Sequence, residues 1–367
     1  MTAASGIIYV NNRKEDNTMV KSMNAAIAGL KAHQTRLDVL GNNIANVNTW
    51  GYKSRTTNFQ DSLYSSIISG QSGRATTGAL GGINTSQLGY GAIVSSISTN
   101  FSASNGQYTG NGLDCMIEGG GFFIVGPYGA PINNADGDNT NGINLVTNDS
   151  TTGVYLSRVG IFSPDANGYL VDDSGNYVYG YALGEPDENG VAPALVEQGL
   201  QPIRVPVDPD TNEPYRIQTW RIGSDGTVTG VDENSENHYI GKIAIASVEN
   251  PNGLEQMNGY YYKVGRNAGR CYGMESTAAV GTVKSNFLEM SNTDLAFDFA
   301  TMITTQRGYQ ANTKIITVTD EILAQLESIR NGEISDFEFT SSISAIQNDL
   351  ESYKDNQRMM QVYYLGQ

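Results

Sequence analysis

The sequence predicts an α+β protein in which N- and C-terminal helices pair as an α-helical coiled coil. The middle of the chain is predicted to form an all-β domain of short strands and hairpins. Apolar residues repeat every seven positions near the start of the chain and again near its end, which is typical of paired helices. Between these regions, short runs rich in Val, Ile and Tyr alternate with Gly-containing turns, which is typical of β-hairpins.

The first helix is expected over about residues 20–48. Its apolar pattern is a pair of positions repeated every seven residues: Met23, Leu30, Leu37 and Ile44, with Ala26, His33, Leu40 and Val47 three positions after each. The helix should end between Gly41 and Val47, because Gly and Asn adopt left-handed conformations and Asn side chains bond the backbone. In the following "NVNTWGYK", Gly51 is expected to have a positive φ.

The middle of the chain changes from a low-complexity connector to short strands. Residues 65–90 are rich in Gly, Ser and Thr, which predicts extended backbone with little packing of its own. In the strand-like zone, "AIVSSISTNFS" and "KIAIASV" alternate, and "LDCMIEGGGFFIV" is an apolar strand interrupted by glycines. Hairpin turns are expected at three dipeptides, Asn167–Gly168, Ser174–Gly175 and Asp225–Gly226.

The second helical region is expected as one helix over residues 293–329, roughly 55 Å long at ~1.5 Å per residue. Its seven-residue series is Leu295, Met302, Tyr309, Ile316 and Leu323, with Leu288 upstream and Phe299, Ile303, Leu326 and Ile329 beside it. Asp294 lies in the first turn, where the helix dipole favours a carboxylate. After a break at Asn331–Gly332, residues 336–364 also have a helical pattern, through Phe339, Ile343, Ile346, Leu350, Tyr353 and Met360.

These patterns divide the chain into six parts. They are an N-terminal extension or misassigned start (1–18), the N-terminal helical part of an inner core domain (19–60), an extended connector (61–90), the central β domain (91–282), the C-terminal helical part of the core domain (283–330) and a helical C-terminal extension (331–367).

The two apolar seams allow two interpretations. One is a helical hairpin within a single chain, and the other is a pair of helices that also face neighbouring copies. Few charges lie in "TTQRGYQANTK", and the first helix is short for a helix that is stable alone, which favours the second interpretation. The predicted self-assembly seam consists of Met23, Leu30, Leu37, Leu40, Ile44, Leu295, Met302, Tyr309, Ile316 and Leu323.

Composition excludes several classes of function. The chain has 22 basic and 38 acidic residues, a formal net charge of −16, so nucleic-acid binding is not expected. No apolar run approaches the ~18 residues of a membrane span, so no direct membrane insertion is expected. "MTAASGIIYVNNRKEDNT" at the N-terminus does not resemble a Sec-type signal peptide.

No catalytic, cofactor-binding or metal-binding residues can be named, and the chain is not expected to be an enzyme. The two histidines, His33 and His238, are too few for a His-based metal site or catalytic triad. His33 is instead expected to pack between helices and to help fix their register. Cys115 is expected as a small buried strand residue and Cys271 as an incidental thiol, with no cross-link. "NADGDNTNG" (134–142) departs from a calcium-binding loop, because Asn141 stands at the position that requires Gly.

Four motifs in order resemble the flagellar rod and hook protein family. "GLKAHQTRLDVLGNNIANVNTWGYK" (29–53) is similar to the family's N-terminal signature. "NFLEMSNTDLAFDFATMITTQRGYQANTKIITVTDEILAQLESI" (286–329) is similar to its C-terminal signature. "GNGLDCMIEGGGFFIV" (110–125) and "FSPDANGYLVDDSGNYVYGY" (162–181) resemble its central β domain.

The resemblance implies a structural subunit that assembles with its own copies into a helical tube. Residues 78–114 look most like hook subunits, which would make the tube a flexible universal joint that transmits torque from rod to filament. The distal rod protein of the basal body is the alternative within the family. A lesser alternative, from another class, is an extracellular carbohydrate-binding β protein with an aromatic cleft and paired carboxylates.

The resemblance also implies partners and a location. The partners would be a homopolymer of the same chain, the distal rod protein, the hook cap, the hook–filament junction proteins and the flagellar type III export apparatus. The location would be the flagellar basal body and hook, outside the cell envelope, after export without a cleaved Sec signal. Family members usually begin near Met19 and end near residue 330. Residues 331–367 are therefore expected to cover an apolar groove of their own subunit, or else to contact a neighbour or another flagellar component.

Overall fold

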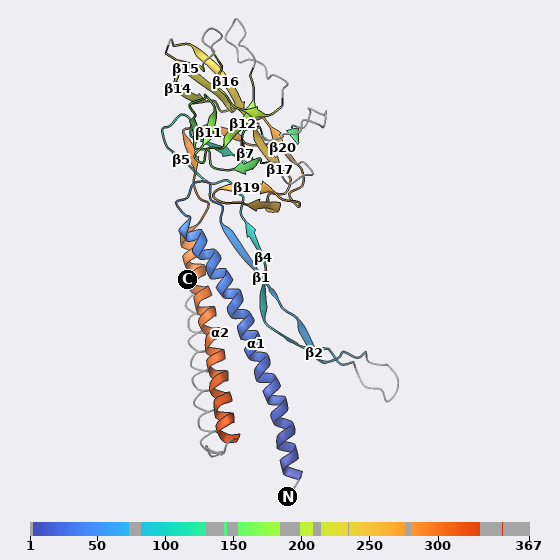
Figure 1. The fold of residues 1–367 in the computed structure, drawn as a ribbon. Coiled ribbons are helices and arrows are strands. Elements are labelled where there is room, and N and C mark those ends of the chain that lie inside the picture. Colours follow the sequence, from blue (N-terminus) through green and yellow to red (C-terminus); the bar gives the residue numbers. More distant parts are fainter. Residues whose placement is uncertain are drawn as a thin grey trace. The chain divides into compact units, whose positions relative to one another are not determined.

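The computed structural model describes residues 3–72, 82–129, 143–144, 153–183, 199–207, 214–233, 235–275, 280–330 and 347, of which residues 3–20, 143, 144, 329 and 330 are described by their backbone alone. The chain forms two compact units (Figure 1). The first unit comprises residues 1–39, 57–97 and 299–367, and the second comprises residues 40–56 and 98–298.

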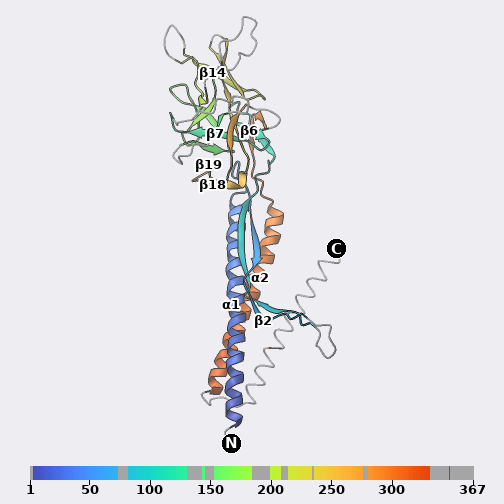
Figure 2. The ribbon, with the colours of Figure 1, turned by 90° about the vertical axis from the view of Figure 1, so that its right-hand side faces the viewer.

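Two long helices contribute most of the first unit. They are α1 (Ala3–Ala45) and α2 (Leu295–Arg330), of 43 and 36 residues, which run side by side in both views (Figures 1 and 2). The end of α1 at Ala45 and the single helix α2 confirm the predicted boundaries. The start of α1 lies upstream of the predicted residue 20, because neither proline nor a turn signal interrupts the helix after Ala3.

The first unit also contains two β-ribbons. One pairs β1 (Arg55–Asp61) with β4 (Ala92–Thr99), and the other pairs β2 (Tyr64–Ile68) with β3 (Ser86–Gly89). The β2–β3 pair is antiparallel, with Tyr64 opposite Gly89 and a register shift between Ser66 and Ile68. Most of the ribbon side chains are exposed, as expected for a connector. The backbone is paired, however, so its hydrogen bonds are satisfied without a core.

The second unit is a β domain around a 14-stranded sheet. The main path of the sheet is β14-β15-β16-β12-β7-β17-β20-β8, and β9, β10, β11, β13, β18 and β19 pair beside it. Two further pairs are β21 with β6 and β22 with β5. The elements of this unit are β5 (Gly106–Tyr108), β6 (Cys115–Glu118), β7 (Phe122–Gly126), β8 (Ile143–Asn144), β9 (Tyr155–Ser157), β10 (Phe162–Pro164), β11 (Leu170–Asp172), β12 (Tyr177–Tyr181), β13 (Gln201–Pro202), β14 (Ile217–Ile222), β15 (Thr227–Asp232), β16 (Asn237–Ile243), β17 (Ile245–Val248), a 3-10 turn (Pro251–Gly253), β18 (Leu254–Gln256), β19 (Tyr261–Val264), β20 (Cys271–Met274), β21 (Thr282–Ser285) and β22 (Phe287–Glu289).

Both faces of the central strands are buried. In β7, Phe123 and Val125 pack in one apolar cluster, whereas Phe122 and Ile124 pack in a second. The stretch from Ile243 to Ala246 is likewise buried at every residue, with its isoleucines in the first cluster and its alanines in the second. A strand that is covered on both faces has a continuous apolar sequence, whereas a strand with one exposed face alternates apolar and polar residues.

The three predicted hairpin turns are confirmed. Strands β10 and β11 pair across Gly168, β11 and β12 pair across Gly175, and β14 and β15 pair across Gly226. Gly226 has φ +82, a left-handed conformation that a residue with a Cβ rarely adopts. Among the described helices, none is long and apolar enough to cross a membrane.

Candidate functional site

Glycines set the contact between the two helices of the first unit. A Cβ added to Gly29 would lie 2.8 Å from Asn312 Nδ2, and a Cβ added to Gly308 would lie 2.8 Å from His33 Nε2. Gly29 and His33 are one helical turn apart, as are Gly308 and Asn312, so the helices run antiparallel. Each glycine therefore provides the space for a polar side chain of the other helix, and we call these four residues the helix contact.

The side chains buried in the first unit are small. Among the described residues of α1 and α2 in this unit, those that are buried are Ala26, Ala32, Thr305 and Thr319. The Thr305 hydroxyl donates to the carbonyl of Thr301 at 2.7 Å, and the Thr319 hydroxyl donates to that of Ile315 at 2.8 Å. Their polar groups are thus satisfied within the helix.

The predicted self-assembly seam keeps much of its surface exposed in the single chain. Leu40 is buried, whereas Leu295 and Tyr309 are exposed. The other seven residues are half-buried: Met23, Leu30, Leu37, Ile44, Met302, Ile316 and Leu323. Gly29 and Gly308 lie against Asn312 and His33 of the opposite helix, so the contacts at this point involve Gly, Asn and His. Whether copies of the chain cover the seam stays a prediction.

His33 lies at the helix contact. The His33 ring packs edge-on against the ring of Phe59 in β1, with centroids 5.7 Å apart. The Arg36 guanidinium lies 5.3 Å from the centre of the Phe59 ring. Burial, and then the charge of Arg36, lower the pKa of His33, which favours the neutral imidazole. A neutral His33 is suited to the packing role that its heptad position predicts.

Large apolar side chains are exposed on both the ribbons and α2. Leu63 is 79% exposed and Ile67 is 64% exposed on the β2–β3 side of the first unit, and Ile303 is 58% exposed on α2. Other exposed apolar residues of this unit are Ile27, Phe59, Tyr64, Ile68, Ile83, Leu88, Ile93, Ile97, Phe299, Tyr309 and Ile315. Several exposed apolar groups along one ribbon are characteristic of a surface that another molecule covers.

The asparagines in the last turn of α1 hold the chain where it leaves the helix. Asn43 makes a pair of bonds with Arg55, in which its Nδ2 donates to the Arg55 carbonyl at 2.9 Å and its Oδ1 accepts from the Arg55 amide at 3.0 Å. The Tyr52 hydroxyl donates to Asn42 Oδ1 at 2.7 Å. Gly51 has φ +63, as predicted. The amide side chains therefore tie Tyr52 and Arg55, which follow the helix, to its last turn.

A buried ionic group, which we call the junction cluster, lies in the second unit. Lys53 Nζ is 2.7 Å from Glu289 Oε1, and Arg158 Nε is 3.6 Å from Glu289 Oε2. Lys53 also donates to the Ser102 carbonyl at 2.8 Å, and Arg158 Nη2 donates to the Gly119 carbonyl at 2.8 Å. All three charged side chains are buried. The cluster joins the segment after α1, the segment before α2 and the β domain.

Burial dominates the electrostatics of this cluster. Burial lowers the pKa of Lys53, as does the charge of Arg158, while Glu289 acts in the opposite direction. Burial also lowers the pKa of Arg158, with Glu289 again opposing. The single carboxylate therefore compensates two buried cations.

The segment before α2 is fixed by side-chain bonds. Asn292 Oδ1 accepts from the Ser54 amide at 2.7 Å, and its Nδ2 donates to the Asn100 carbonyl at 2.8 Å. Asp294 caps α2, because its Oδ1 accepts from the amides of Ala296 and Phe297 at 3.0 and 3.1 Å. Asp298 is buried in the first turn, and burial raises its pKa.

The cysteines are buried free thiols. Cys115 is a fully buried residue of β6, which confirms its predicted place in a strand. Cys271 is equally buried in β20, so it is a core residue. Burial raises the pKa of the Cys271 thiol to about 12, and that of Cys115 is raised well above its usual value.

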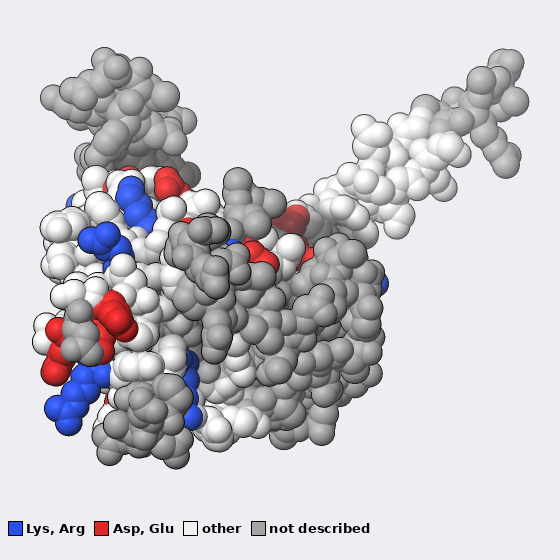
Figure 3. Space-filling view, turned by 90° about the horizontal axis from the view of Figure 1, so that it is seen from above, with Lys and Arg blue, Asp and Glu red and all other residues white. Residues whose placement is uncertain are grey.

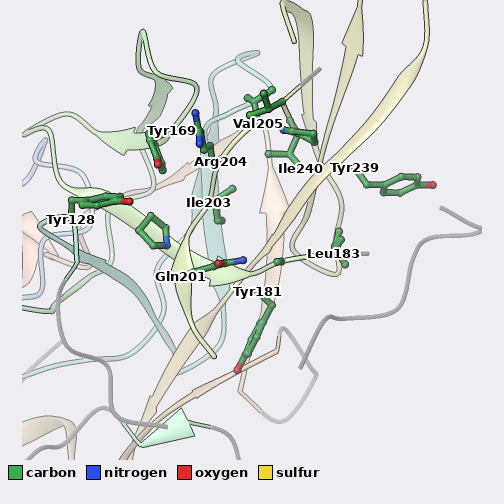
Figure 4. Close-up of a pocket in the computed structure, with 14 residues that line it drawn as sticks. Tyr128, Tyr169, Tyr181, Leu183, Gln201, Ile203, Arg204, Val205, Tyr239 and Ile240 are labelled. Carbon is green, nitrogen blue, oxygen red and sulfur yellow. The ribbon is translucent and has the colours of Figure 1, made fainter. Parts of the chain in front are cut away.

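A cavity of about 460 Å³ in the β domain has tyrosines at its wall (Figure 4). The Arg204 guanidinium lies 5.1 Å from the centre of the Tyr169 ring, and Tyr128 lies beside Tyr169. None of the fourteen described residues that line the cavity carries a carboxyl group. The paired carboxylates expected for the carbohydrate-binding alternative are therefore not provided by this wall.

Charged side chains of both signs are interspersed on the face of the molecule drawn in Figure 3. Among the residues that the structure describes, no three His, Cys, Asp or Glu side chains are grouped to hold a metal ion. The loop "NADGDNTNG" (134–142) and the C-terminal extension lie outside the described residues, apart from Gln347.

Sequence reasoning missed the junction cluster and the glycines of the helix contact. The signal for the junction cluster was present, because Lys53 ends one quoted motif and Glu289 lies near the start of another. The pairing could not be read from either motif alone. Gly29 and Gly308 lie beside the apolar seams, but a heptad pattern is defined by large apolar side chains and does not include glycines.

Two stretches of the chain match known protein families. Residues 23–53 match the family described as "Flagella basal body rod protein", and residues 284–329 match "Flagellar basal body rod FlgEFG protein C-terminal". These stretches contain every residue of the predicted seam, together with Lys53 and Glu289 of the junction cluster.

Whole-chain relatives agree with these matches. The chain is 35% identical over 314 residues to the flagellar basal-body rod protein FlgG of Bacillus subtilis, covering 85% of this chain and 100% of the relative. It is 29% identical over 307 residues to FlgG of Agrobacterium fabrum, covering 83% of this chain and 97% of the relative. It is 26% identical over 445 residues to the flagellar hook protein FlgE of Borreliella burgdorferi, covering 85% of this chain and 100% of the relative.

Proposed function

Since this chain belongs to the family of flagellar rod and hook proteins, we propose that it is a distal-rod subunit that assembles into a helical tube. The observation that most strongly supports a rod subunit is the length of the relatives. The alignment with the B. subtilis rod protein spans 314 residues and includes the whole relative, whereas the alignment with a hook protein extends to 445 residues. The chain is therefore close to rod proteins in size as well as in identity.

The hook subunit is the second candidate. Residues 78–114 look most like hook subunits, whereas the lengths of the relatives favour the rod. The hook remains a candidate because the β2–β3 ribbon contains exposed apolar residues and glycines. Such a ribbon can shift against a neighbour while breaking few buried contacts.

The geometry supports assembly through surfaces that one chain leaves uncovered. The helix contact pairs α1 and α2 through two glycines and two polar side chains, and the large seam side chains beside it retain exposed area. Covering apolar area is worth roughly 25 cal/mol per Å². Copies of the chain would gain this free energy when they pack side by side, and we propose that this gain drives formation of the coiled-coil inner part of the tube.

The junction cluster would keep the ends of both helices attached to the β domain while the tube carries torque. Its bonds connect Lys53, Arg158 and Glu289, which belong to three distant parts of the sequence. A buried ion pair resists separation because each charge would be left uncompensated. Transmission of force from the helical part to the β part would thus depend on this cluster.

The members of this family are flagellar proteins, so the chain is located in the flagellum and takes part in motility. The proposed partners are further copies of this chain, the neighbouring rod or hook subunits, the hook cap, the hook–filament junction proteins and the type III export apparatus. This role is structural and requires no catalytic residue.

Deletion of the gene, followed by electron cryotomography of the basal bodies, tests the proposal. A distal-rod subunit predicts basal bodies in which the rod is cut short and no hook is present. Complete rods without hooks would instead identify the chain as a hook subunit. Normal rods and hooks would refute both candidates. Expression of the gene from a plasmid should restore the missing structure and serves as the control.

A further inference from the structure

The cavity of about 460 Å³ in the β domain has the wall of a small-molecule site (Figure 4). Apart from Gln201 and Arg204, all fourteen described residues that line it are apolar or aromatic. Pockets that bind small organic molecules have volumes of roughly 300–1,000 Å³ and combine such a wall with a few polar groups. The assembly of copies proposed above makes no use of this cavity, so the two can be tested separately.

Arg204 provides the charge of this wall, and the backbone beside it is fixed. Arg204 forms an antiparallel β-bridge with Tyr169. Next to this bridge, the Leu170 amide donates to the Ile203 carbonyl at 3.0 Å. The guanidinium lies 5.1 Å from the centre of the Tyr169 ring, which is a cation–π contact. An arginine held on an aromatic ring is oriented before a ligand arrives, so less side-chain entropy is lost on binding.

No described carboxylate compensates Arg204. The ion pairs between described residues involve other side chains, and none of the described wall residues is Asp or Glu. The Arg204 side chain is exposed. Its planar guanidinium is therefore available to an anion, and the geometry that it matches best is a carboxylate bound through two parallel hydrogen bonds.

Three tyrosines beside Arg204 form a group that we call the tyrosine rim. Tyr128, Tyr169 and Tyr177 pack edge-on against one another, with ring centroids 5.2 to 5.7 Å apart. Tyr128 is nevertheless 66% exposed, and Figure 4 shows it on the same side of the cavity as Tyr169 and Arg204. The rim thus presents apolar ring surface and a hydroxyl close to the guanidinium.

We propose that this cavity binds a small organic carboxylate whose charged group lies against Arg204 and whose apolar or aromatic body lies along the tyrosine rim. One uncompensated cation is suited to one negative charge. A phosphate ester carries up to two charges and would leave net negative charge beside a chain whose formal net charge is −16. A neutral ligand would form weaker hydrogen bonds, because charge-assisted bonds are roughly twice as strong as neutral ones.

Matched aromatic probes added to the full-length chain test the inference. Para-fluorobenzoate and para-fluorobenzamide have nearly the same size and differ in charge, and para-fluorophenyl phosphate supplies the larger charge. Fluorine NMR titrations in dilute solution, where the chain is monomeric, measure the dissociation constant of each probe. We expect the benzoate to bind about tenfold more tightly than the benzamide, since a hydrogen bond to a charged group contributes about 1 kcal/mol more than a neutral one. The phosphate should bind no more tightly than the benzoate.

Substitutions assign the effect to the cavity. Arg204→Gln should remove the preference for the benzoate, whereas Arg204→Lys, which keeps the charge but not the planar fork, should retain part of it. Tyr128→Ala should weaken binding of both probes, because it removes ring surface that both contact. The matched control is Arg221→Gln, because Arg221 is also exposed but lies on β14 and does not line the cavity. This variant should bind all three probes as the native chain does.

The comparison of the three probes on the native chain requires no substitution, so it decides the question even where a variant disturbs folding. Equal affinities for the benzoate and the benzamide would overturn the inference, as would a benzoate affinity that Arg204→Gln leaves unchanged. Tighter binding of the phosphate would show that the site does not select a single charge. Absence of binding by every probe at millimolar concentration would show that the cavity is not a ligand site.

Discussion

Lys53 and Glu289 are 236 residues apart in the chain, yet Lys53 Nζ lies 2.7 Å from Glu289 Oε1 and both side chains are fully buried. The first residue follows α1 and the second precedes α2, so one ion pair fastens both helix ends to the β domain. With Arg158 beside them, the cluster contains two cations and one carboxylate.

The charge count predicts unequal effects of two substitutions. Glu289→Gln leaves two buried cations without a carboxylate and should lower the free energy of unfolding by about 3–5 kcal/mol. Lys53→Met leaves Arg158 paired with Glu289 and should lower it by a smaller amount. Urea denaturation monitored by tryptophan fluorescence measures both values.

The matched control for this pair is Lys242→Met. Lys242 pairs with Glu275 at 2.7 Å, but the side chains are 15% and 40% exposed. Loss of a partly exposed pair should change the free energy of unfolding by about 0–1 kcal/mol. A Lys53→Met variant that is less stable than Glu289→Gln would refute the charge argument.

Asp298 predicts a pH-dependent effect on stability. Burial raises its pKa in the folded chain above the ordinary value of 3.8. Between 3.8 and the raised value the folded chain binds more protons than the unfolded chain, so the contribution of Asp298 to stability falls as pH rises through this window. Asp298→Asn should therefore be more favourable, relative to the native chain, at pH 7 than at pH 3.

Urea denaturation of the native chain and of the Asp298→Asn variant at pH 3 and at pH 7 measures how the effect of the substitution changes with pH. Asp294→Asn is the control, because Asp294 is exposed and caps the same helix. An effect of Asp298→Asn that is the same at pH 3 and pH 7 would show that ionisation of Asp298 is not costly in the folded state.

The contact between Gly308 of α2 and His33 of α1 predicts that substitutions at these two residues affect stability in a coupled way. Gly308→Ala adds a Cβ that would lie 2.8 Å from the His33 ring, so the clash should outweigh the gain in helix propensity. Gly41→Ala, where a Cβ meets nothing within 4 Å, should instead raise the free energy of unfolding by about 0.5–1 kcal/mol.

A double-mutant cycle isolates the contact. In a His33→Ala background, Gly308→Ala should lose most of its destabilising effect, because the ring that it meets is gone. Additive effects of the two substitutions would mean that Gly308 and His33 do not pack against each other.

The exposed ribbon predicts a variant that folds but does not assemble. Leu63→Ser combined with Ile67→Ser removes apolar area that is already exposed, so thermal denaturation should change little. Motility and the length of rods or hooks should fall, because the variant loses area that neighbours would cover. Ser66→Ala changes an exposed polar residue between these two positions and should leave thermal denaturation and motility unchanged. Normal motility of the double variant would exclude this ribbon from the assembly surface.

Local sequence signals predicted much of the fold. The end of α1, the single helix α2, the carboxylate of Asp294 at the start of α2, the positive φ of Gly51 and the turn at Gly226 depend on residues that are adjacent in the chain. Glycine, asparagine and aspartate have the same conformational preferences wherever they occur, so such signals need no knowledge of the tertiary structure.

Contacts between distant residues could not be predicted in the same way. The heptad pattern identified which faces of the helices are apolar, but it did not indicate that Gly29 and Gly308 lie against side chains of the opposite helix. The pairing of Lys53 with Glu289 depends on how the β domain brings two remote segments together. The order of fourteen strands likewise follows from packing on both faces of the sheet rather than from any one strand.

The central claim is that a single chain leaves apolar surface exposed and that further copies of the chain cover it. Sedimentation velocity of the purified full-length protein over a range of concentrations, with electron microscopy of the fastest species, tests it most directly. We expect monomers in dilute solution and, above a threshold concentration, helical tubes or protofilaments that Tyr309→Asp together with Leu295→Asp abolishes without unfolding the chain. A native protein that stays monomeric at every concentration, or tubes that form equally well from this double variant, would contradict the claim.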